Sequence, residues 1–89
     1  MSWAIEFDRQ GKRDLDKLDT QVRNRILRFL LGRVALLEDP RSIGEALRGT
    51  ELGDFWKYRV GDYRIIAKIE DRKVQILIVR VGNRREVYR

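Results

Sequence analysis

The chain has 89 residues, 43% of them hydrophobic and 38% charged, which provides for one small core and no second domain. It has no cysteine and no histidine, and this excludes disulfides, thiolate nucleophiles, the usual zinc sites and the commonest general base. The formal net charge of +6 comes entirely from residues 55–89, where 10 Lys and Arg stand against 4 Asp and Glu; a concentration of this kind favours a nucleic-acid partner over a merely solvated surface.

The N-terminal residues predict a short strand. Over residues 2–7, Trp3, Ile5 and Phe7 alternate with Ala4 and Glu6, as in a half-buried strand. This stretch has no basic region followed by an apolar signal core, and no later run approaches the ~20 apolar residues that a membrane-spanning helix needs. We therefore expect a single domain, residues 1–89, in the cytoplasm and without a membrane partner.

Two helices joined by a short loop are predicted next. Asp8 is a suitable N-cap for a helix over residues 9–18, and Asp19 or Thr20 for a longer helix that ends at Asp39 and Pro40. Apolar residues recur in the longer helix at roughly 3.6 residues, at Val22, Ile26, Phe29 or Leu30, Val34 and Leu37.

The longer helix has more apolar residues than one buried stripe needs. Leu27, Leu31 and Leu36 are in excess. They are either further core residues or a docking surface for another chain. Residues 41–54, which follow, predict a connecting loop with a helical turn over residues 44–47.

Residues 55–64, FWKYRVGDYR, predict a β-hairpin. Gly61 and Asp62 suit a two-residue type II′ turn, which sets Tyr58 opposite Ile65 and Arg59 opposite Arg64. A second hairpin is predicted from strands over residues 63–70 and 73–81. A two-residue loop at residues 71–72 would pair residue 67 with residue 76, residue 65 with residue 78, and residue 66 with residue 77.

The alternation along these strands predicts two different sheet faces. The helices are expected to cover Trp56, Tyr58, Val60, Ile65, Ala67, Ile69, Val74, Ile76 and Ile78. The opposite face is expected to present Lys57, Arg59, Arg64 and Lys68 around Ile66, Leu77 and Val79. The predicted fold is a two-layer α+β sandwich in the order β-α-α-β-β-β, a helical hairpin packed on a small, mainly antiparallel sheet.

The cationic face is the candidate functional surface. Facing Arg59 and Arg64 repel each other, and a polyanionic ligand would explain why this costly pair is present. Arg accounts for 15 of the 20 cations and suits bidentate contact with phosphate. At the C-terminus, Arg84, Arg85 and Tyr88 combine cations with an aromatic ring, which can hold a phosphate and stack a base; a frayed, solvated terminus is the alternative.

Three short motifs, in this order of elements, carry a family resemblance. The LRG of residues 47–49, the WKYRVGDYRII of residues 56–66 and the VGNRREVYR of residues 81–89 resemble the RelE/ParE superfamily of small toxins, and specifically its RelE branch. The resemblance covers the whole chain. It implies a type II toxin that enters the ribosomal A site and cleaves mRNA there, without a cofactor or metal. It also implies inhibition by an antitoxin encoded nearby, with a monomeric free toxin and a higher-order toxin–antitoxin complex.

The resemblance assigns roles to individual residues. Lys57 matches a catalytic lysine of the family, and Arg59 stands where the best-studied members have a second lysine. Arg64 matches the arginine that stabilises the phosphate. Arg84 matches the arginine taken to protonate the leaving group, and Tyr88 the aromatic residue that stacks on the mRNA.

Three further residues are expected to bind RNA: Lys68, Asn83 and Arg85. Asn83 stands where many relatives have histidine, and Arg84 and Arg85 could exchange roles. Arg59 departs from the family pattern. Because an arginine stays protonated up to pH ~12, this residue cannot act as the base. For the antitoxin, the excess apolar residues Leu27, Leu31 and Leu36 are the expected contact.

The residue chemistry fits RNA cleavage by the substrate's own 2′-hydroxyl. The protein then needs only to align this nucleophile, neutralise charge and move protons. We expect no two-metal mechanism, because Asp62, Glu70 and Asp71 fall at turn tips. Two alternatives remain: a ParE-like inhibitor of DNA gyrase without nuclease activity, and a noncatalytic RNA-binding module.

Overall fold

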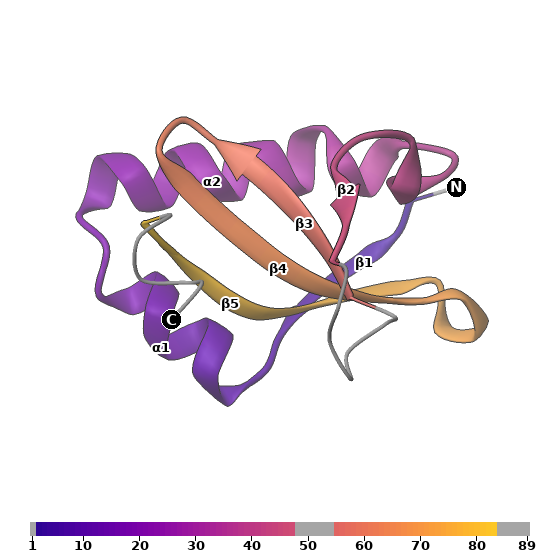
Figure 1. Cartoon of the computed structure of the whole chain (residues 1–89), viewed down its shortest axis with the longest axis horizontal. Helices are drawn as coiled ribbons and strands as arrows, with labels where there is room; N and C mark the ends of the chain where they lie inside the picture. Colours follow the sequence, from indigo (N-terminus) through magenta and orange to yellow (C-terminus); the bar gives the residue numbers. More distant parts are fainter. Residues whose placement is uncertain (1, 48–54, 84–89) are drawn as a thin grey trace.

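The chain folds into one mixed sheet with two helices packed on it. The computed structural model describes residues 2–47 and 55–83 (Figure 1). The strands are β1 (Ala4–Phe7), β2 (Glu45–Ala46), β3 (Phe55–Val60), β4 (Tyr63–Glu70) and β5 (Gln75–Asn83), in the spatial order β1-β5-β4-β3-β2. β1 runs parallel to β5, and all other neighbours are antiparallel. The helices are α1 (Arg9–Asp16) and α2 (Thr20–Gly32). The predicted two-layer α+β fold is confirmed, with β2 as an additional strand.

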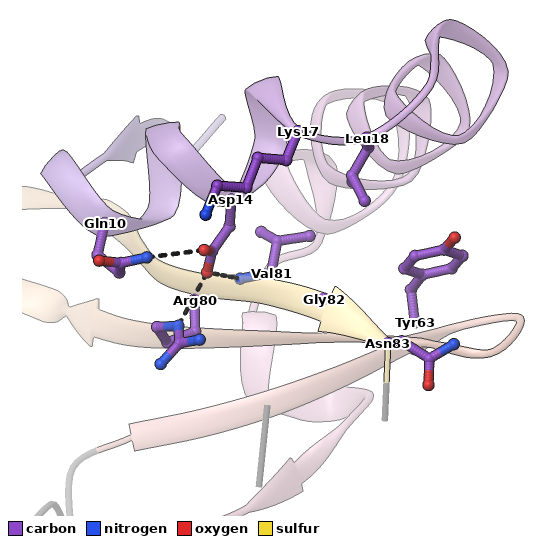
Figure 2. Close-up of a pocket in the computed structure, with 9 residues that line it drawn as sticks. All are labelled: Gln10, Asp14, Lys17, Leu18, Tyr63, Arg80, Val81, Gly82 and Asn83. Carbon is purple, nitrogen blue, oxygen red and sulfur yellow. Dashed lines mark hydrogen bonds and ion pairs between the residues drawn. The ribbon is translucent and has the colours of Figure 1, made fainter. Parts of the chain in front are cut away.

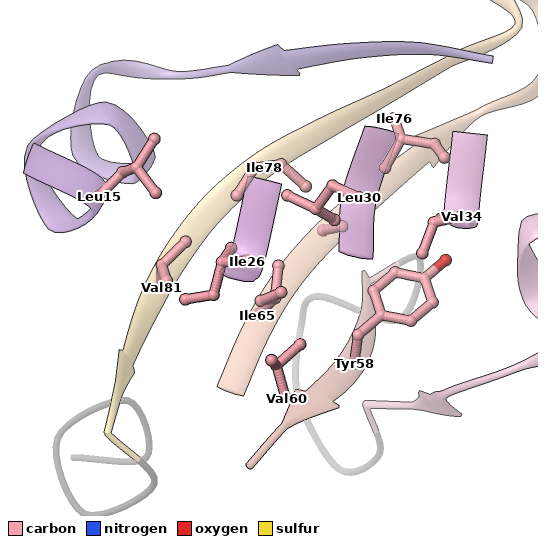
Figure 3. Packing of buried hydrophobic residues seen from close by; sticks show 11 residues of the cluster. Leu15, Ile26, Leu30, Val34, Tyr58, Val60, Ile65, Ile76, Ile78 and Val81 are labelled. Carbon is pink, nitrogen blue, oxygen red and sulfur yellow. The ribbon is translucent and has the colours of Figure 1, made fainter. Parts of the chain in front are cut away.

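The core lies between the helices and one sheet face (Figure 3). Its buried members are Leu15, Ile26, Leu30, Val34, Tyr58, Val60, Ile65, Ala67, Ile76, Ile78 and Val81. Trp56 packs against this cluster as a half-buried residue, whereas Val74 lies outside the strands, in the connection before β5. The predicted inner face is therefore confirmed except at Val74. No helix among the described residues is long and apolar enough to cross a bilayer.

Both predicted N-caps are confirmed. The Asp8 carboxylate accepts a hydrogen bond from Gly11 N at 2.7 Å, and that of Asp19 accepts one from Val22 N at 2.9 Å. These bonds satisfy backbone N–H groups that the first turn of a helix leaves without partners. The first helix ends at Asp16, two residues earlier than predicted.

The prediction that the second helix continues to Asp39 is wrong. α2 ends at Gly32, because Arg33 leaves the helical conformation with φ −130° and ψ −64°, and a 3-10 turn follows over Val34–Leu36. The break exposes the carbonyl of Ala35, which accepts a hydrogen bond from Trp3 N at 2.8 Å. Val34 is thereby turned into the core. A contact with the far N-terminus thus overrides the local helical pattern.

The predicted helical turn at residues 44–47 is also wrong. Glu45 and Ala46 form β2, which pairs with Lys57 and Trp56 of β3. A short 3-10 turn, Pro40–Ser42, precedes it. β2 extends the sheet on the side that carries the candidate functional residues.

The two hairpins differ in how well their register could be predicted. The β3–β4 pairing, with Arg59 opposite Arg64 and Tyr58 opposite Ile65, is confirmed. The β4–β5 pairing is shifted by two residues, so that residue 67 faces residue 78, because the connection is a three-residue 3-10 turn, Asp71–Lys73, followed by left-handed Val74 (φ 49°). A bulge in β5 at residue 79 adds a further shift between the pairs of residues 66 and 67, so that residue 65 faces residue 81 and residue 66 faces residue 80.

Candidate functional site

A small hollow on the outer sheet face gathers the cationic side chains of the β3–β4 hairpin. Its volume is about 80 Å³, and it is lined by Gly44, Glu45, Lys57, Tyr58, Arg59 and Arg64. The structure thus brings together three of the sequence-predicted catalytic residues, and Lys57, Arg59 and Arg64 come from two adjacent strands. The volume exceeds that of two water molecules, at roughly 30 Å³ each in the liquid, so a phosphate group would fit.

Glu45 is a member of this site that the sequence did not predict. Its Oε2 lies 3.4 Å from Lys57 Nζ, and its side chain is 76% exposed. Among the described residues, the hollow is therefore lined by three cations and one carboxylate. A single exposed carboxylate beside a lysine can accept a proton, which Arg59 cannot.

Several contacts hold β2 and Glu45 in place. Gly44 has a φ of +82°, and a Cβ there would lie 2.6 Å from the carbonyl oxygen of Lys57, so only glycine lets β2 approach β3 this closely. The preceding backbone is held by side chains of β3: Trp56 Nε1 donates to Ile43 O and Tyr58 Oη donates to Pro40 O, both at 2.7 Å. Burial raises the pKa of the Tyr58 phenol well above its usual value, so this hydroxyl remains a donor.

Arg41 adds a further anchor to the same segment. Its guanidinium donates to both carboxylate oxygens of Asp71 in the β4–β5 connection, at 3.0 and 2.8 Å. The hydrogen bond from Arg41, together with its charge, lowers the pKa of the Asp71 carboxyl. This bidentate pair ties the segment before β2 to the β4–β5 connection.

Arg64 is arranged to receive an anion. It faces Arg59 across the hairpin, which concentrates positive charge. Its Nη1 atom is buried and has no hydrogen-bond partner among the described residues. A buried donor without a partner is costly, and a phosphate oxygen would satisfy it.

The other predicted site residues are distributed more widely. Lys68 lies exposed on β4, four residues beyond Arg64 and on the same face. Asn83 ends β5, next to Gly82, which pairs with Arg64. Three predicted residues, Arg84, Arg85 and Tyr88, lie outside the described part of the chain. No group of three Asp or Glu side chains that could hold a metal ion occurs within residues 2–47 and 55–83.

Asn83 also lines a second, larger hollow beside the end of β5 (Figure 2). Its volume is about 610 Å³, and its lining residues are Gln10, Asp14, Lys17, Leu18, Tyr63, Arg80, Val81, Gly82 and Asn83. α1 and β5 form one wall of this hollow. Hydrogen bonds from Arg80 and Val81 to Asp14 connect the two elements, and Gln10 donates a further one to Asp14.

The excess apolar residues of the predicted long helix differ in their exposure to solvent. Leu31 and Leu36 are 54% and 62% exposed, and they are the large apolar side chains that the described surface leaves open. Leu27 packs against the core cluster. The predicted docking surface is thereby reduced to Leu31 and Leu36.

Comparisons with known proteins point in one direction. Residues 5–88 match the family model described as the ParE toxin of the type II toxin-antitoxin system parDE. The chain is 30% identical over 89 residues to Toxin RelG of Mycobacterium tuberculosis, covering 100% of this chain and 99% of that protein. It is 32% identical over 90 residues to the mRNA interferase toxin RelE of Escherichia coli, covering 99% and 92%. The fold is similar to a chain of the toxin-antitoxin complex RelBE2 of M. tuberculosis, with a TM-score of 0.83, 28% identity and coverage of 94% and 93%.

Proposed function

The chain belongs to the RelE/ParE superfamily of type II toxin-antitoxin toxins, as a RelE-type toxin, and from this premise we propose that it cleaves mRNA on the ribosome. The observation that carries the proposal is the convergence of Lys57, Arg59 and Arg64 on one hollow. The related RelE toxin of E. coli is named an mRNA interferase. The cleaved strand would lie across the outer sheet face, in the ribosomal A site.

The proposed reaction uses the RNA's own 2′-hydroxyl as the nucleophile and needs no metal. The 2′-oxygen bonds to the adjacent phosphorus while the bond to the 5′-oxygen breaks, leaving a 2′,3′-cyclic phosphate and a 5′-hydroxyl. Arg64 and Arg59 would neutralise the charge that develops on the phosphate oxygens. In this scheme the buried Nη1 of Arg64 gains the hydrogen-bond acceptor that it lacks in the described residues.

Two protons must also move. We propose that the Glu45 carboxylate takes the proton of the 2′-hydroxyl, because it lines the hollow and contacts Lys57, whereas Arg59 stays protonated. Lys57 would then orient Glu45 and contribute charge. Arg84 or Arg85 would donate the proton to the 5′-oxygen. With one carboxylate and no histidine, we expect slow cleavage of free RNA and efficient cleavage only where the ribosome aligns the strand.

The second partner is an antitoxin. The solved relative RelBE2 is a toxin-antitoxin complex. For this chain we propose that the antitoxin covers the cationic face and docks an apolar side on Leu31 and Leu36. A toxin free of antitoxin would expose both surfaces to solvent, and burial of two leucines would contribute to affinity.

A translating extract tests the function. Wild-type protein should cut mRNA in the A site of stalled ribosomes and leave the same mRNA intact without ribosomes. Arg64→Ala should reduce this cleavage by roughly 100-fold or more. Arg72→Ala, which removes an equal charge from the exposed β4–β5 connection, should cleave at the wild-type rate.

Two other outcomes of this experiment would favour a different function. Intact mRNA with inhibition of DNA supercoiling by gyrase would support the ParE-like alternative. The matched family model is that of the ParE toxin, so this alternative needs its own test. Intact mRNA, active gyrase and retained RNA binding would support a noncatalytic binding module.

A further inference from the structure

The edge of β5 that faces away from β4 changes its partner halfway along the strand. β1 pairs with β5 only as far as Ile78, which faces Phe7. Asp8 N then donates to Ile78 O at 3.0 Å, and the chain turns into α1. From residue 79 onward, the described element that lies beside this edge of β5 is α1 (Figure 2).

Asp14 of α1 takes the role that a neighbouring strand would have. Its Oδ2 accepts hydrogen bonds from Val81 N at 2.9 Å and from Arg80 Nε at 2.8 Å, while its Oδ1 accepts one from Gln10 Nε2 at 2.8 Å (Figure 2). The residue is only 7% exposed. A charge so deeply buried is stable only when it is paired and hydrogen-bonded, and these three contacts meet that condition.

The local sequence brings Asp14 to this edge. At Gly11 a Cβ atom would lie 2.1 Å from the carbonyl oxygen of Ile78, so only glycine permits the close approach of α1 to β5. Asp14 follows three residues later, on the same side of the helix. Gln10, four residues before Asp14, fixes the orientation of its carboxylate.

The contact comes directly after the bulge in β5. The pairing shifts between residues 66 and 67, and as a result Val81 enters the core and Gly82 faces Arg64. A bulged strand end with a free edge could adopt more than one direction. The hydrogen bonds to Asp14 select one of them.

We propose that Asp14 is a positioning residue that, with Arg80, fixes the direction of the end of β5 relative to Arg64. The inference rests on the proposed function, because it matters for the proton donors assigned to Arg84 or Arg85. These residues begin two positions after Gly82, the partner of Arg64. Asp14 is not among the residues that line the small hollow of Lys57, Arg59 and Arg64, so we expect it to act on alignment and not on substrate binding.

The ionisation state of Asp14 supports this role. Burial by itself would raise the pKa of the carboxyl, but the hydrogen bonds from Val81, Arg80 and Gln10 and the charge of Arg80 outweigh it and lower the pKa below its usual value. The group therefore stays ionised throughout the neutral range. Its contribution to stability is complete above the unfolded-state pKa of ~3.9 and is lost as the pH falls through the folded-state value.

The test compares Asp14→Ala and Asp14→Asn with Asp16→Ala. Asp16 lies on the same helix and pairs with Lys12 at the surface, so it controls for loss of an acid from α1. We expect Asp14→Ala to speed hydrogen exchange at the Val81 and Gly82 amides by at least tenfold, with unchanged exchange at Ile65 and Ile76. Single-turnover cleavage should fall by about 100-fold at an unchanged half-saturating ribosome concentration. For Asp14→Asn, which keeps the side-chain volume and one acceptor, we expect exchange and cleavage rates between those of the wild type and Asp14→Ala.

Two results would overturn the proposal. One is a folded Asp14 variant that cleaves at the wild-type rate. The other is a loss of cleavage in which the core amides exchange faster to the same degree, since this would make Asp14 a general stability residue. A wild-type chain that cleaves no mRNA would instead count against the proposed function, and exchange at Val81 would still decide whether Asp14 orders the end of β5.

Discussion

Neighbouring residues of β3 face opposite layers of the molecule and have opposite chemical roles. Tyr58 is 1% exposed, and its ring meets Phe29 edge to face at 5.9 Å. Lys57 and Arg59, on either side of it, line the outer hollow. A single strand thus joins the core to the candidate active site, and substitutions along it should separate stability from activity.

Substitution of Tyr58 and of Arg64 should have different effects on stability. Tyr58→Ala removes a buried aromatic ring and should cost about 3 to 5 kcal/mol of unfolding free energy. Arg64→Ala removes a buried donor without a partner and the repulsion with Arg59, so its melting temperature should equal or exceed that of the wild type. Thermal melts of both variants measure this. Equal losses would mean that the two sheet faces have been assigned the wrong way round.

The Tyr58 hydroxyl should produce an alkaline dependence of stability. Burial, reinforced by nearby Asp39 and partly offset by Arg41, raises the pKa of the phenol in the folded state. A raised pKa gives a contribution to stability that is complete below the unfolded-state value of ~10 and is lost as the pH rises further. At pH 7, Tyr58→Phe should cost about 1 kcal/mol through the lost bond to Pro40. Urea unfolding should show that the difference in unfolding free energy between the wild type and Tyr58→Phe decreases above pH ~10, by up to about 1.4 kcal/mol per pH unit. A constant gap would contradict the ionisation argument.

Catalytic loss should follow the proposed roles. Arg64→Ala and Arg84→Ala should be the slowest variants, each losing ~10²- to 10³-fold, because they remove charge stabilisation or the proton donor. Glu45→Gln should lose at least ~10²-fold, because a glutamine cannot accept the proton. Lys57→Ala should lose less, and Arg59→Lys should be mild or activating, since lysine keeps the charge and can deprotonate.

Single-turnover cleavage of ribosome-bound mRNA measures these rates, with folding checked by circular dichroism. Wild-type cleavage by Glu45→Gln would assign the base elsewhere. If Arg64→Ala and Arg84→Ala both cut at the wild-type rate, the outer face is not the active site.

Among the helices and strands, the features that depend on neighbouring residues in the sequence were predicted correctly. The β3–β4 hairpin was predictable because its turn residues, Gly61 and Asp62, fix the register by themselves, and Gly61 has the required positive φ of 59°. The caps at Asp8 and Asp19 follow from the same kind of local signal. The cationic side chains of this hairpin were therefore assigned to the correct face.

Elements that depend on distant contacts were missed. β2 is held by Trp56 and Tyr58, more than ten residues away in sequence, so no local pattern marked it or placed Glu45 in the site. The bulge in β5 had one available signal. Strict alternation from Ile76 and Ile78 would bury the charged side chain of Arg80, and a bulge avoids this. The bond between Asp14 and Val81 spans 67 residues and has no local signature.

The exposed leucines after and within α2 should contribute to antitoxin binding. Leu31→Glu places a charge in the proposed contact and should weaken the affinity for the cognate antitoxin by tenfold or more, because the proposed complex would bury this leucine, which is exposed in the single chain. Gln21→Glu adds the same charge at an exposed position near the start of α2 and should bind normally. Titration calorimetry with folded variants compares them. An unchanged affinity for Leu31→Glu would remove this helix from the interface.

At the scale of the whole molecule, charge is divided between the two parts of the chain. All of the net +6 belongs to residues 55–89, and the cations of β3 and β4 project from the sheet face opposite the helices. The N-terminal part balances its cations with acids, as in the surface pair of Lys12 and Asp16. RNA should therefore approach one side of the molecule and bind with a strong dependence on salt.

Two lysines of equal charge and opposite location should separate this directional attraction from net charge alone. Lys68 projects from β4 on the cationic face, whereas Lys12 lies on α1. Each neutralised phosphate of single-stranded RNA adds about 0.7 to the slope of log affinity against log salt. Lys68→Gln should therefore weaken binding and lower that slope by about 0.7 between 50 and 200 mM salt, while Lys12→Gln should leave the slope unchanged. Fluorescence anisotropy with a short single-stranded RNA measures both variants. Equal slopes would mean that RNA responds to the overall charge and not to the face that the β3–β4 hairpin presents.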